Sequence, residues 1–141
     1  MENETLLLAA GAMLAFGIGG FLVKYALRDI QPMTLYLGEM AVALAALLIY
    51  ILIKKPDMGF ENMAAKDYGI ILLIGLLFFI AILFMYYALV KGYASTVIPL
   101  VNLNMVIVVI LAVLILKEKL TFTSSAGVAL SVIAIYLLSR G

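Results

Sequence analysis

Long apolar segments alternate with short polar ones along the chain, and their lengths predict helices that cross a membrane. A helix needs about 20 predominantly apolar residues to span the hydrocarbon core of a bilayer. Segments of this length recur from one end of the sequence to the other. We therefore predict an all-α integral membrane protein. Its five predicted transmembrane helices cover about Thr5–Leu27, Met33–Ile53, Tyr68–Val90, Ser95–Leu116 and Phe122–Ser139.

The polar connections between these spans are short, with one exception. The segment KKPDMGFENMAAKD, from Lys54 to Asp67, is long and polar enough to form a loop, and its Pro56 and Gly59 interrupt helical structure. The spans use most of the 141 residues, which leaves no room for a soluble catalytic domain. We predict a single transmembrane domain over residues 1–141.

Composition points to the same class of protein. The chain is 67% hydrophobic with a mean hydropathy of +1.27, whereas globular domains are about 45–50% apolar. The first apolar segment is not read as a signal peptide, because Glu2 and Glu4 stand where basic residues are expected and the segment is too long. We expect a multi-pass protein of the cell (inner or plasma) membrane, surrounded by the lipid bilayer.

The low net charge and the absence of two residue types limit the kinds of chemistry that the chain can perform. The net charge is only +1, so no basic field favours a nucleic-acid partner. The chain has neither Cys nor His, which removes thiolates, the commonest metal ligand and the commonest general base. We therefore expect no metal, no cofactor and no enzymatic activity.

Basic residues give little indication of orientation. Five lie on the N-terminal side of the spans and four on the other, so the positive-inside bias is almost absent. Either the N-terminus is inside with a weak signal, or the chain inserts in both orientations and two opposed copies assemble, as in transporters built from inverted halves. The two groups are Lys54, Lys55, Lys66, Lys117 and Lys119, and Lys24, Arg28, Lys91 and Arg140.

Small residues repeat every four positions in the first span, at Gly11, Ala15 and Gly19. Such a stripe lets another helix backbone approach closely. We interpret it as a helix-packing face, and the alternative is that the glycines also form a hinge.

Tyrosines and asparagines gather toward the membrane side opposite the N-terminus. One of Tyr86 and Tyr87 is expected to point into the bundle, while an aromatic belt at the headgroups is the alternative. Asn102 and Asn104 follow Pro99, which is expected in the first turn of its helix. Residues two positions apart on a helix point in directions about 200° apart. One Asn is therefore expected to line a cavity and the other to bond a neighbouring helix.

Two charged side chains lie inside predicted spans at similar depth, Lys24 and Glu39. Ionisable residues within the membrane are costly and usually face the bundle interior or a water-filled cavity. Lys24 can extend its ammonium to the headgroups, but Glu39 has a shorter stem. Tyr36 and Glu39 share a helical face, so we predict a substrate- or proton-binding cavity there, with a structural partnership between Glu39 and Lys24 as the alternative.

The sequence LKEKLTFTSSAGVAL joins the last two predicted spans: one helix ends in Lys-Glu-Lys-Leu-Thr, and Gly127 opens the next after a short gap. Together with Ala94–Thr96 and Pro99, this pattern resembles the EamA-type domain of the drug/metabolite transporter superfamily. The resemblance spans Gly92 to Arg140 and extends to the whole chain in span count and loop pattern. It implies an export or exchange transporter made of one five-helix domain, an EamA-like half-transporter.

Comparison with the EamA pattern also indicates a position where this chain differs from its relatives. Relatives often have Arg at the position of Glu39, followed four residues later by Ala, here Ala43. The inverted charge favours a proton or a cation over an anion. The related small multidrug resistance proteins work as opposed dimers and couple protons to cationic drugs through a membrane carboxylate. That carboxylate lies in their first helix, so its role does not transfer to Glu39 by position.

Two functions remain as hypotheses. The first is a secondary transporter that exports or exchanges a small metabolite or cationic compound by alternating access, as an antiparallel homodimer or a paralogous heterodimer. Its predicted substrate- or proton-binding residues are Lys24, Tyr36, Glu39, Tyr86, Tyr87, Asn102 and Asn104. The second is a non-transporting membrane subunit, either half of a heteromeric lipid flippase or a scaffold.

Overall fold

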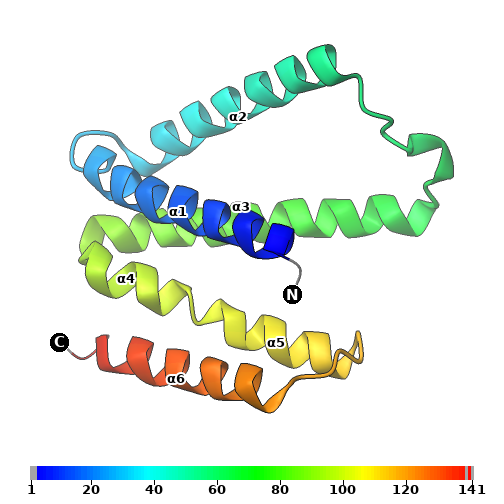
Figure 1. Ribbon diagram of the computed structural model, residues 1–141. Coiled ribbons are helices and arrows are strands. Elements are labelled where there is room, and N and C mark those ends of the chain that lie inside the picture. Colours follow the sequence, from blue (N-terminus) through cyan, green and yellow to red (C-terminus); the bar gives the residue numbers. More distant parts are fainter. Residues whose placement is uncertain (1–2, 139, 141) are drawn as a thin grey trace. The chain divides into compact units, whose positions relative to one another are not determined.

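The computed structural model describes residues 3–138 and 140, and its elements are helical (Figure 1). The predicted all-α architecture is confirmed. A short 3-10 turn, η1, interrupts the long polar connection. The elements are α1 (Asn3–Ala26), α2 (Pro32–Lys54), η1 (Phe60–Asn62), α3 (Ala65–Lys91), α4 (Ala94–Val101), α5 (Asn104–Leu114) and α6 (Phe122–Leu138).

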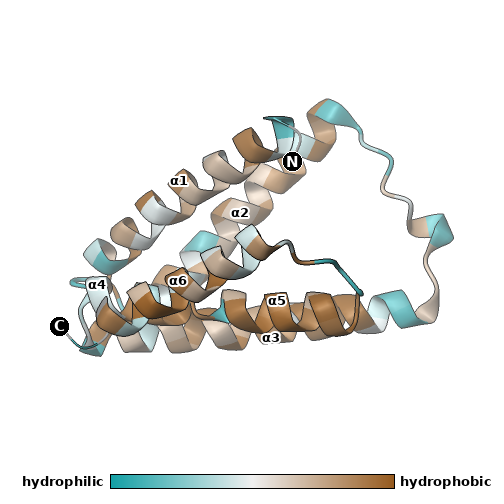
Figure 2. Ribbon diagram, turned by 60° about the horizontal axis from the view of Figure 1, so that its bottom comes forward, coloured by the Kyte–Doolittle hydropathy of each residue, from teal (hydrophilic) through white to brown (hydrophobic). Residues whose placement is uncertain are grey.

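Helix lengths match a membrane-spanning chain. Among the described residues, four stretches are long and apolar enough to cross a bilayer: α1, α2, α3 and the stretch Ala94–Leu114. The last helix, α6, has 17 residues, which corresponds to about 25 Å of axial rise. Ser139, the predicted end of that span, lies outside the described residues. Figure 2 shows the hydrophobic colour running along α3 and α5, with hydrophilic colour at helix ends and connections.

The fourth predicted span is interrupted, which corrects the expectation of one continuous helix. It consists of α4 and α5, separated by a tight turn at Asn102–Leu103. Backbone N–H groups at the turn donate to the carbonyl three residues back, the 3-10 pattern. These bonds are Leu103 to Leu100 (3.2 Å), Met105 to Asn102 (3.2 Å) and Val106 to Leu103 (3.0 Å).

Pro99 explains part of this interruption. It lies inside α4, after five helical residues, so the expectation of a first-turn position is wrong. Proline has no N–H to donate and its ring crowds the preceding turn, which weakens a helix interior. Asn102 follows three residues later, and Asn has low helix propensity because its side chain competes for backbone hydrogen bonds.

Local hydrogen bonds define where two helices begin. At α3, the backbone N–H of Ala64 donates to Oδ2 of Asp67 at 2.8 Å. At α6, the backbone N–H of Ser124 donates to Oγ1 of Thr121 at 3.1 Å. Both satisfy N–H groups that have no partner within a helix. Thr121 belongs to the segment that carries the family resemblance, so this part of the pattern has a capping role.

Two lysines adopt the left-handed conformation near helix ends. Lys55 follows α2 with φ 44°, and its N–H donates to the carbonyl of Ile51 at 2.8 Å. Lys117 has φ 58° and lies after α5. At Lys55 this conformation ends α2. Glycine usually occupies such a position because a side chain adds a cost of about 1 kcal/mol.

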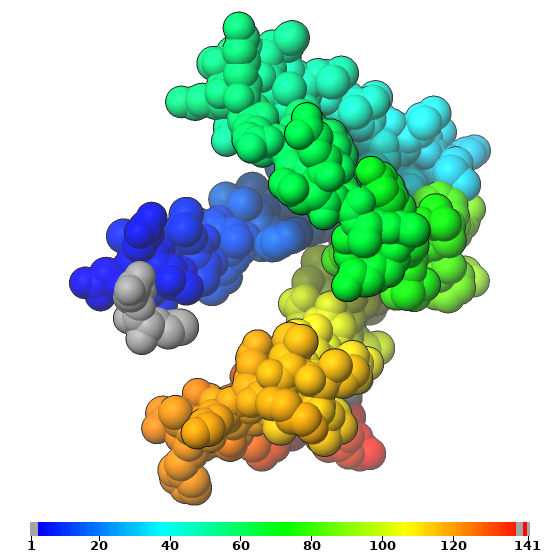
Figure 3. Space-filling view, turned by 90° about the vertical axis from the view of Figure 1, so that its right-hand side faces the viewer, coloured from blue at the N-terminus to red at the C-terminus, as the bar shows by residue number. Residues whose placement is uncertain are grey.

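Contacts divide the chain into two compact units, Met1–Leu22 with Lys91–Gly141, and Val23–Val90. In the Val23–Val90 unit, α2 and α3 lie together at one end and diverge toward the polar connection (Figure 1). The start of α2, cyan, touches the end of α3, yellow-green, in the space-filling view (Figure 3). The buried side chains of the described residues all belong to this unit: Leu27, Tyr36, Tyr86 and Leu89.

The other unit packs along α4. This helix contacts α6. It also contacts α1 at Gly20, where an added Cβ would lie 3.2 Å from Cδ1 of Ile98. The glycine therefore allows a close approach between α1 and α4.

Candidate functional site

Tyr86 lies at the centre of the candidate site, near the end of α3. Its side chain is 2% exposed, and its hydroxyl donates a hydrogen bond to Oε2 of Glu39 on α2. Hydrogen bonds to an ionised carboxylate are stronger than those between neutral groups. The bond joins α2 to α3 at the end where the two helices meet, and it gives the carboxyl a partner from protein.

Aromatic rings surround this hydrogen bond. The Tyr36 ring lies 6.1 Å from the Tyr86 ring in an edge-on arrangement and 5.8 Å from the Phe79 ring. Tyr36 and Glu39 are three residues apart on α2, and Phe79 and Tyr86 are seven apart on α3, so each pair shares a helical face. We call Tyr36, Glu39, Phe79 and Tyr86 together the Glu39 site.

Lys24 connects the end of α1 to the same turn of α3. Its Nζ donates to the backbone carbonyl of Leu89 at 2.5 Å. The side chain of Leu89 is fully buried, and Leu27 is 8% exposed. Lys24 is thus held by protein rather than extended away from it, and three helices meet within about one turn of Tyr86.

The chemistry of this arrangement is that of a single carboxyl in apolar and aromatic surroundings. Such a group binds a proton or a cationic group, and aromatic faces attract cations as well. The described residues contain no cluster of three His, Cys, Asp or Glu side chains that could hold a metal ion. The Glu39 site thus presents one acidic side chain, hydrogen-bonded by Tyr86, among aromatic rings.

Comparison with known proteins gives the chain its family. The sequence profile of the EamA-like transporter family matches residues 3–140. The chain belongs to this family. An uncharacterized protein of Methanocaldococcus jannaschii is 36% identical over 124 residues, which cover 88% of each chain. No solved structure gave a significant match.

Family membership confirms the resemblance inferred from the region around Gly127. This EamA domain is a multi-pass membrane protein of a transporter family of the drug/metabolite superfamily. The Glu39 site thus belongs to a chain whose relatives move small molecules across a bilayer.

The structure separates the remaining predicted site residues into different environments. Tyr87, next to Tyr86, is 48% exposed, so Tyr86 is the member of the pair that points inward. Asn102 and Asn104 are exposed and belong to the other compact unit, where Asn102 lies in the turn between α4 and α5 and Asn104 begins α5. Within the Val23–Val90 unit, the predicted residues Lys24, Tyr36, Glu39 and Tyr86 come together.

The predicted packing stripe faces open space within the described chain. An added Cβ at Gly11 or Gly19 would have no heavy atom of another helix within 4 Å. Gly20, which lies outside the predicted stripe, is the glycine that approaches another helix. The packing role of Gly11, Ala15 and Gly19 therefore stays a prediction for a contact with another chain.

Sequence reasoning missed two contributors to the site, Phe79 and the carbonyl of Leu89. The seven-residue spacing between Phe79 and Tyr86 was the available signal, because it places both on one face. A backbone carbonyl leaves no signature in residue types. Its role could be foreseen only from its place in the last turn of α3, where carbonyls lack partners within the helix.

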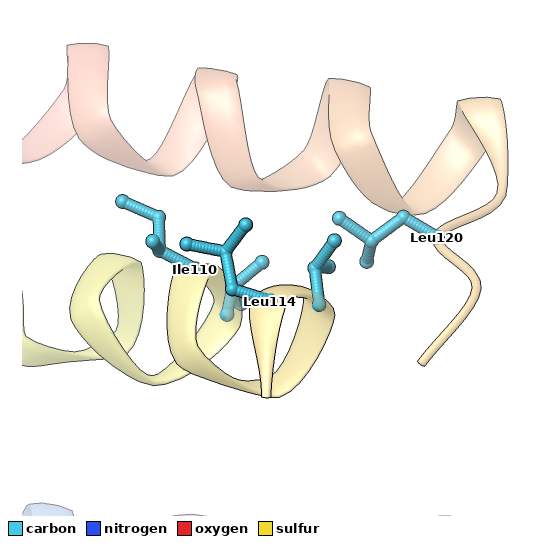
Figure 4. A pocket seen from close by; sticks show the side chains of 5 residues that line it. Ile110, Leu114 and Leu120 are labelled. Carbon is cyan, nitrogen blue, oxygen red and sulfur yellow. The ribbon is translucent and has the colours of Figure 1, made fainter. Parts of the chain in front are cut away.

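A separate apolar hollow of about 250 Å³ lies beside α5 in the other unit (Figure 4). Its lining side chains are all hydrocarbon, so it presents no polar group to orient a charged substrate. They are Val109, Ile110, Val113, Leu114 and Leu120. The hollow is suited to apolar contents.

Proposed function

We propose that this EamA domain is a secondary transporter that exports or exchanges a small metabolite or cationic compound by alternating access. The hydrogen bond between Tyr86 and Glu39 carries this proposal, because it places the one carboxyl within the predicted spans among aromatic rings. Intramembrane acidic residues typically mark ion or substrate pathways. We assign no enzymatic role to the chain.

In this mechanism Glu39 binds either a proton or the cationic group of the substrate. Tyr86 holds the carboxyl while no cation is bound, and the rings of Tyr36 and Phe79 supply faces that attract positive charge. Substrate and proton compete for the same oxygens, so binding of one releases the other. This competition couples the two fluxes.

Alternating access also requires an element that bends. The turn between α4 and α5 supports this part of the proposal, because discontinuous helices are common in secondary transporters near their binding sites. We propose that one of Asn102 and Asn104 lines the cavity while the other bonds a neighbouring helix.

The proposed assembly is a dimer in the cell membrane, either an antiparallel homodimer or a paralogous heterodimer. An odd number of spans and the balanced distribution of basic residues support inverted pairing, because inverted repeats underlie many transporters. The unfilled face of Gly11, Ala15 and Gly19 is suited to such a contact. A tag on the C-terminus would be found on both membrane faces for the homodimer and on one face for the heterodimer.

Proton-coupled flux in proteoliposomes tests the mechanism. Tetraphenylphosphonium serves as the cationic probe, and an entrapped pH-sensitive dye reports proton movement when the probe is added. We expect Glu39→Gln to lower the coupled flux at least about tenfold, which corresponds to roughly 1.4 kcal/mol in the barrier. The matched control Glu61→Gln changes an exposed carboxyl in η1 and is expected to retain the flux.

The outcomes separate the two hypotheses. Undiminished coupling in Glu39→Gln removes Glu39 from the mechanism. Flux that appears only when the chain is reconstituted with a paralogue supports the heterodimeric transporter. A wild-type chain that moves neither protons nor probe, by itself or with a paralogue, favours the alternative of a non-transporting membrane subunit.

A further inference from the structure

The last turn of α3 is where the buried side chains of the Val23–Val90 unit converge. Tyr86 and Leu89 lie three residues apart on one face of this helix and are 2% and 0% exposed. Tyr36 from α2 and Leu27 from the end of α1 are the other buried side chains among the described residues. A shift of this turn would therefore move Tyr86 relative to Glu39.

Lys24 forms a polar contact with this turn. The carbonyl of Leu89 is one of the last four of α3, which have no partner within the helix. Water is scarce in the hydrocarbon region, so such a carbonyl needs a donor from protein. The ammonium of Lys24 supplies one at 2.5 Å. Its positive charge also suits the negative end of the helix dipole.

We infer that Lys24 is a positioning residue for the Glu39 site: it fixes the last turn of α3 so that the Tyr86 hydroxyl reaches the Glu39 carboxyl. The inference rests on the proposed function, in which Glu39 binds the proton or cation. Lys24 acts through Leu89 and Tyr86 and does not itself bind the substrate. A lysine that only supplies a hydrogen bond to the last carbonyls of α3 would stabilise the helix without changing the hydrogen bonding of the Glu39 carboxyl.

Infrared spectroscopy of the full chain in proteoliposomes distinguishes these roles without a substrate. The carboxyl bands of Glu39 are isolated as the difference between wild type and Glu39→Gln. Tyr86→Phe removes the hydroxyl and defines the band position of a carboxyl without this hydrogen bond. We expect Lys24→Met to shift the Glu39 band toward that position, and Lys24→Arg, which keeps the charge and the donors, to restore it.

Lys91→Met is the matched control, because Lys91 also lies at the end of α3 but is exposed. We expect it to leave the Glu39 band at the wild-type position. If Lys24→Met does not insert into membranes, Lys24→Gln, which removes the charge and shortens the reach, is compared in the same way.

A Glu39 band that stays at the wild-type position in Lys24→Met, or in Lys24→Gln where that variant is used instead, overturns the inference. A band that does not respond to Tyr86→Phe overturns it as well, since there is then no hydroxyl bond to position. The flux measurement on Glu39→Gln is independent of this comparison. Its failure would remove the transport role and leave the band positions unchanged, so the two failures are distinguishable.

Discussion

The hydroxyl of Tyr86 and the carboxyl of Glu39, 47 positions apart in the chain, form a hydrogen bond that joins α3 to α2. The bond lies at the end where these helices meet, beside the Tyr36 ring. It gives an acidic side chain in an apolar helix a defined partner.

Replacing Tyr86 by Phe removes the donor and keeps the ring. Interhelical hydrogen bonds in membrane proteins contribute about 0.6–2 kcal/mol, so we expect a loss of that size in the free energy of unfolding in mixed micelles. Coupled proton flux is expected to fall as well, because Glu39 loses the group that holds it. Tyr87→Phe changes the exposed neighbour and is expected to alter neither quantity. Equal effects of the two substitutions would contradict the assignment of Tyr86 to the site.

Replacing Tyr36 by Ala removes two ring contacts, one with Phe79 and one with Tyr86. Aromatic pairs contribute about 0.5–1.5 kcal/mol each beyond area burial, so we expect a loss of about 1–3 kcal/mol in the free energy of unfolding. Tyr36→Phe keeps the ring and should retain most of this stability. A large loss in Tyr36→Phe would show that the hydroxyl, rather than the ring, matters at this position.

Replacing Pro99 by Ala returns an N–H that can bond the carbonyl of Ser95. A proline within a helix costs up to about 3 kcal/mol, so the substitution is expected to raise thermal stability in detergent. If the turn between α4 and α5 bends during transport, flux should fall at the same time. Val97→Ala, in the same helix, is the control. A stabilised Pro99→Ala variant with full flux would show that transport does not need the break.

Replacing Asp67 by Ala removes the acceptor for the N–H of Ala64 at the start of α3. Loss of a helix cap costs about 0.5–2 kcal/mol, which should lower the melting temperature in detergent. Ala64→Ser supplies the other half of a capping box and should raise it. Because this end of α3 is far along the helix from Tyr86, coupled flux is expected to remain in both variants. A loss of flux without a loss of stability would contradict a purely capping role.

The spans followed from the sequence because their apolar lengths fit a bilayer, and the helix boundaries differ by only a few residues. The break after Pro99 was not predicted. Proline and Asn102 both weaken a helix, but membrane helices often accommodate such residues when neighbours supply hydrogen bonds. The sequence alone does not say whether those neighbours are present.

The site was predictable where polar residues stand out on an apolar background. Glu39 and Tyr36 share a face by their spacing, and both contact Tyr86. The choice between Tyr86 and Tyr87 was not predictable, because α3 is apolar on all sides and no stripe marks the face toward α2. Phe79 was missed because its seven-residue spacing from Tyr86 identifies it only once Tyr86 is known to point inward.

Lys55 and Lys117 have a consequence for how the helices can move. Lys55 caps α2 in a left-handed conformation, so the residue that ends this helix also carries a charge, and Lys117 adopts the same conformation three residues after α5 ends at Leu114. An ammonium is costly to draw into hydrocarbon, and it stays at the headgroup level. The end of α2 and the segment that follows α5 are thereby restricted in depth. We expect any motion at these two places to be a tilt about the membrane surface, with a piston-like slide along the membrane normal disfavoured.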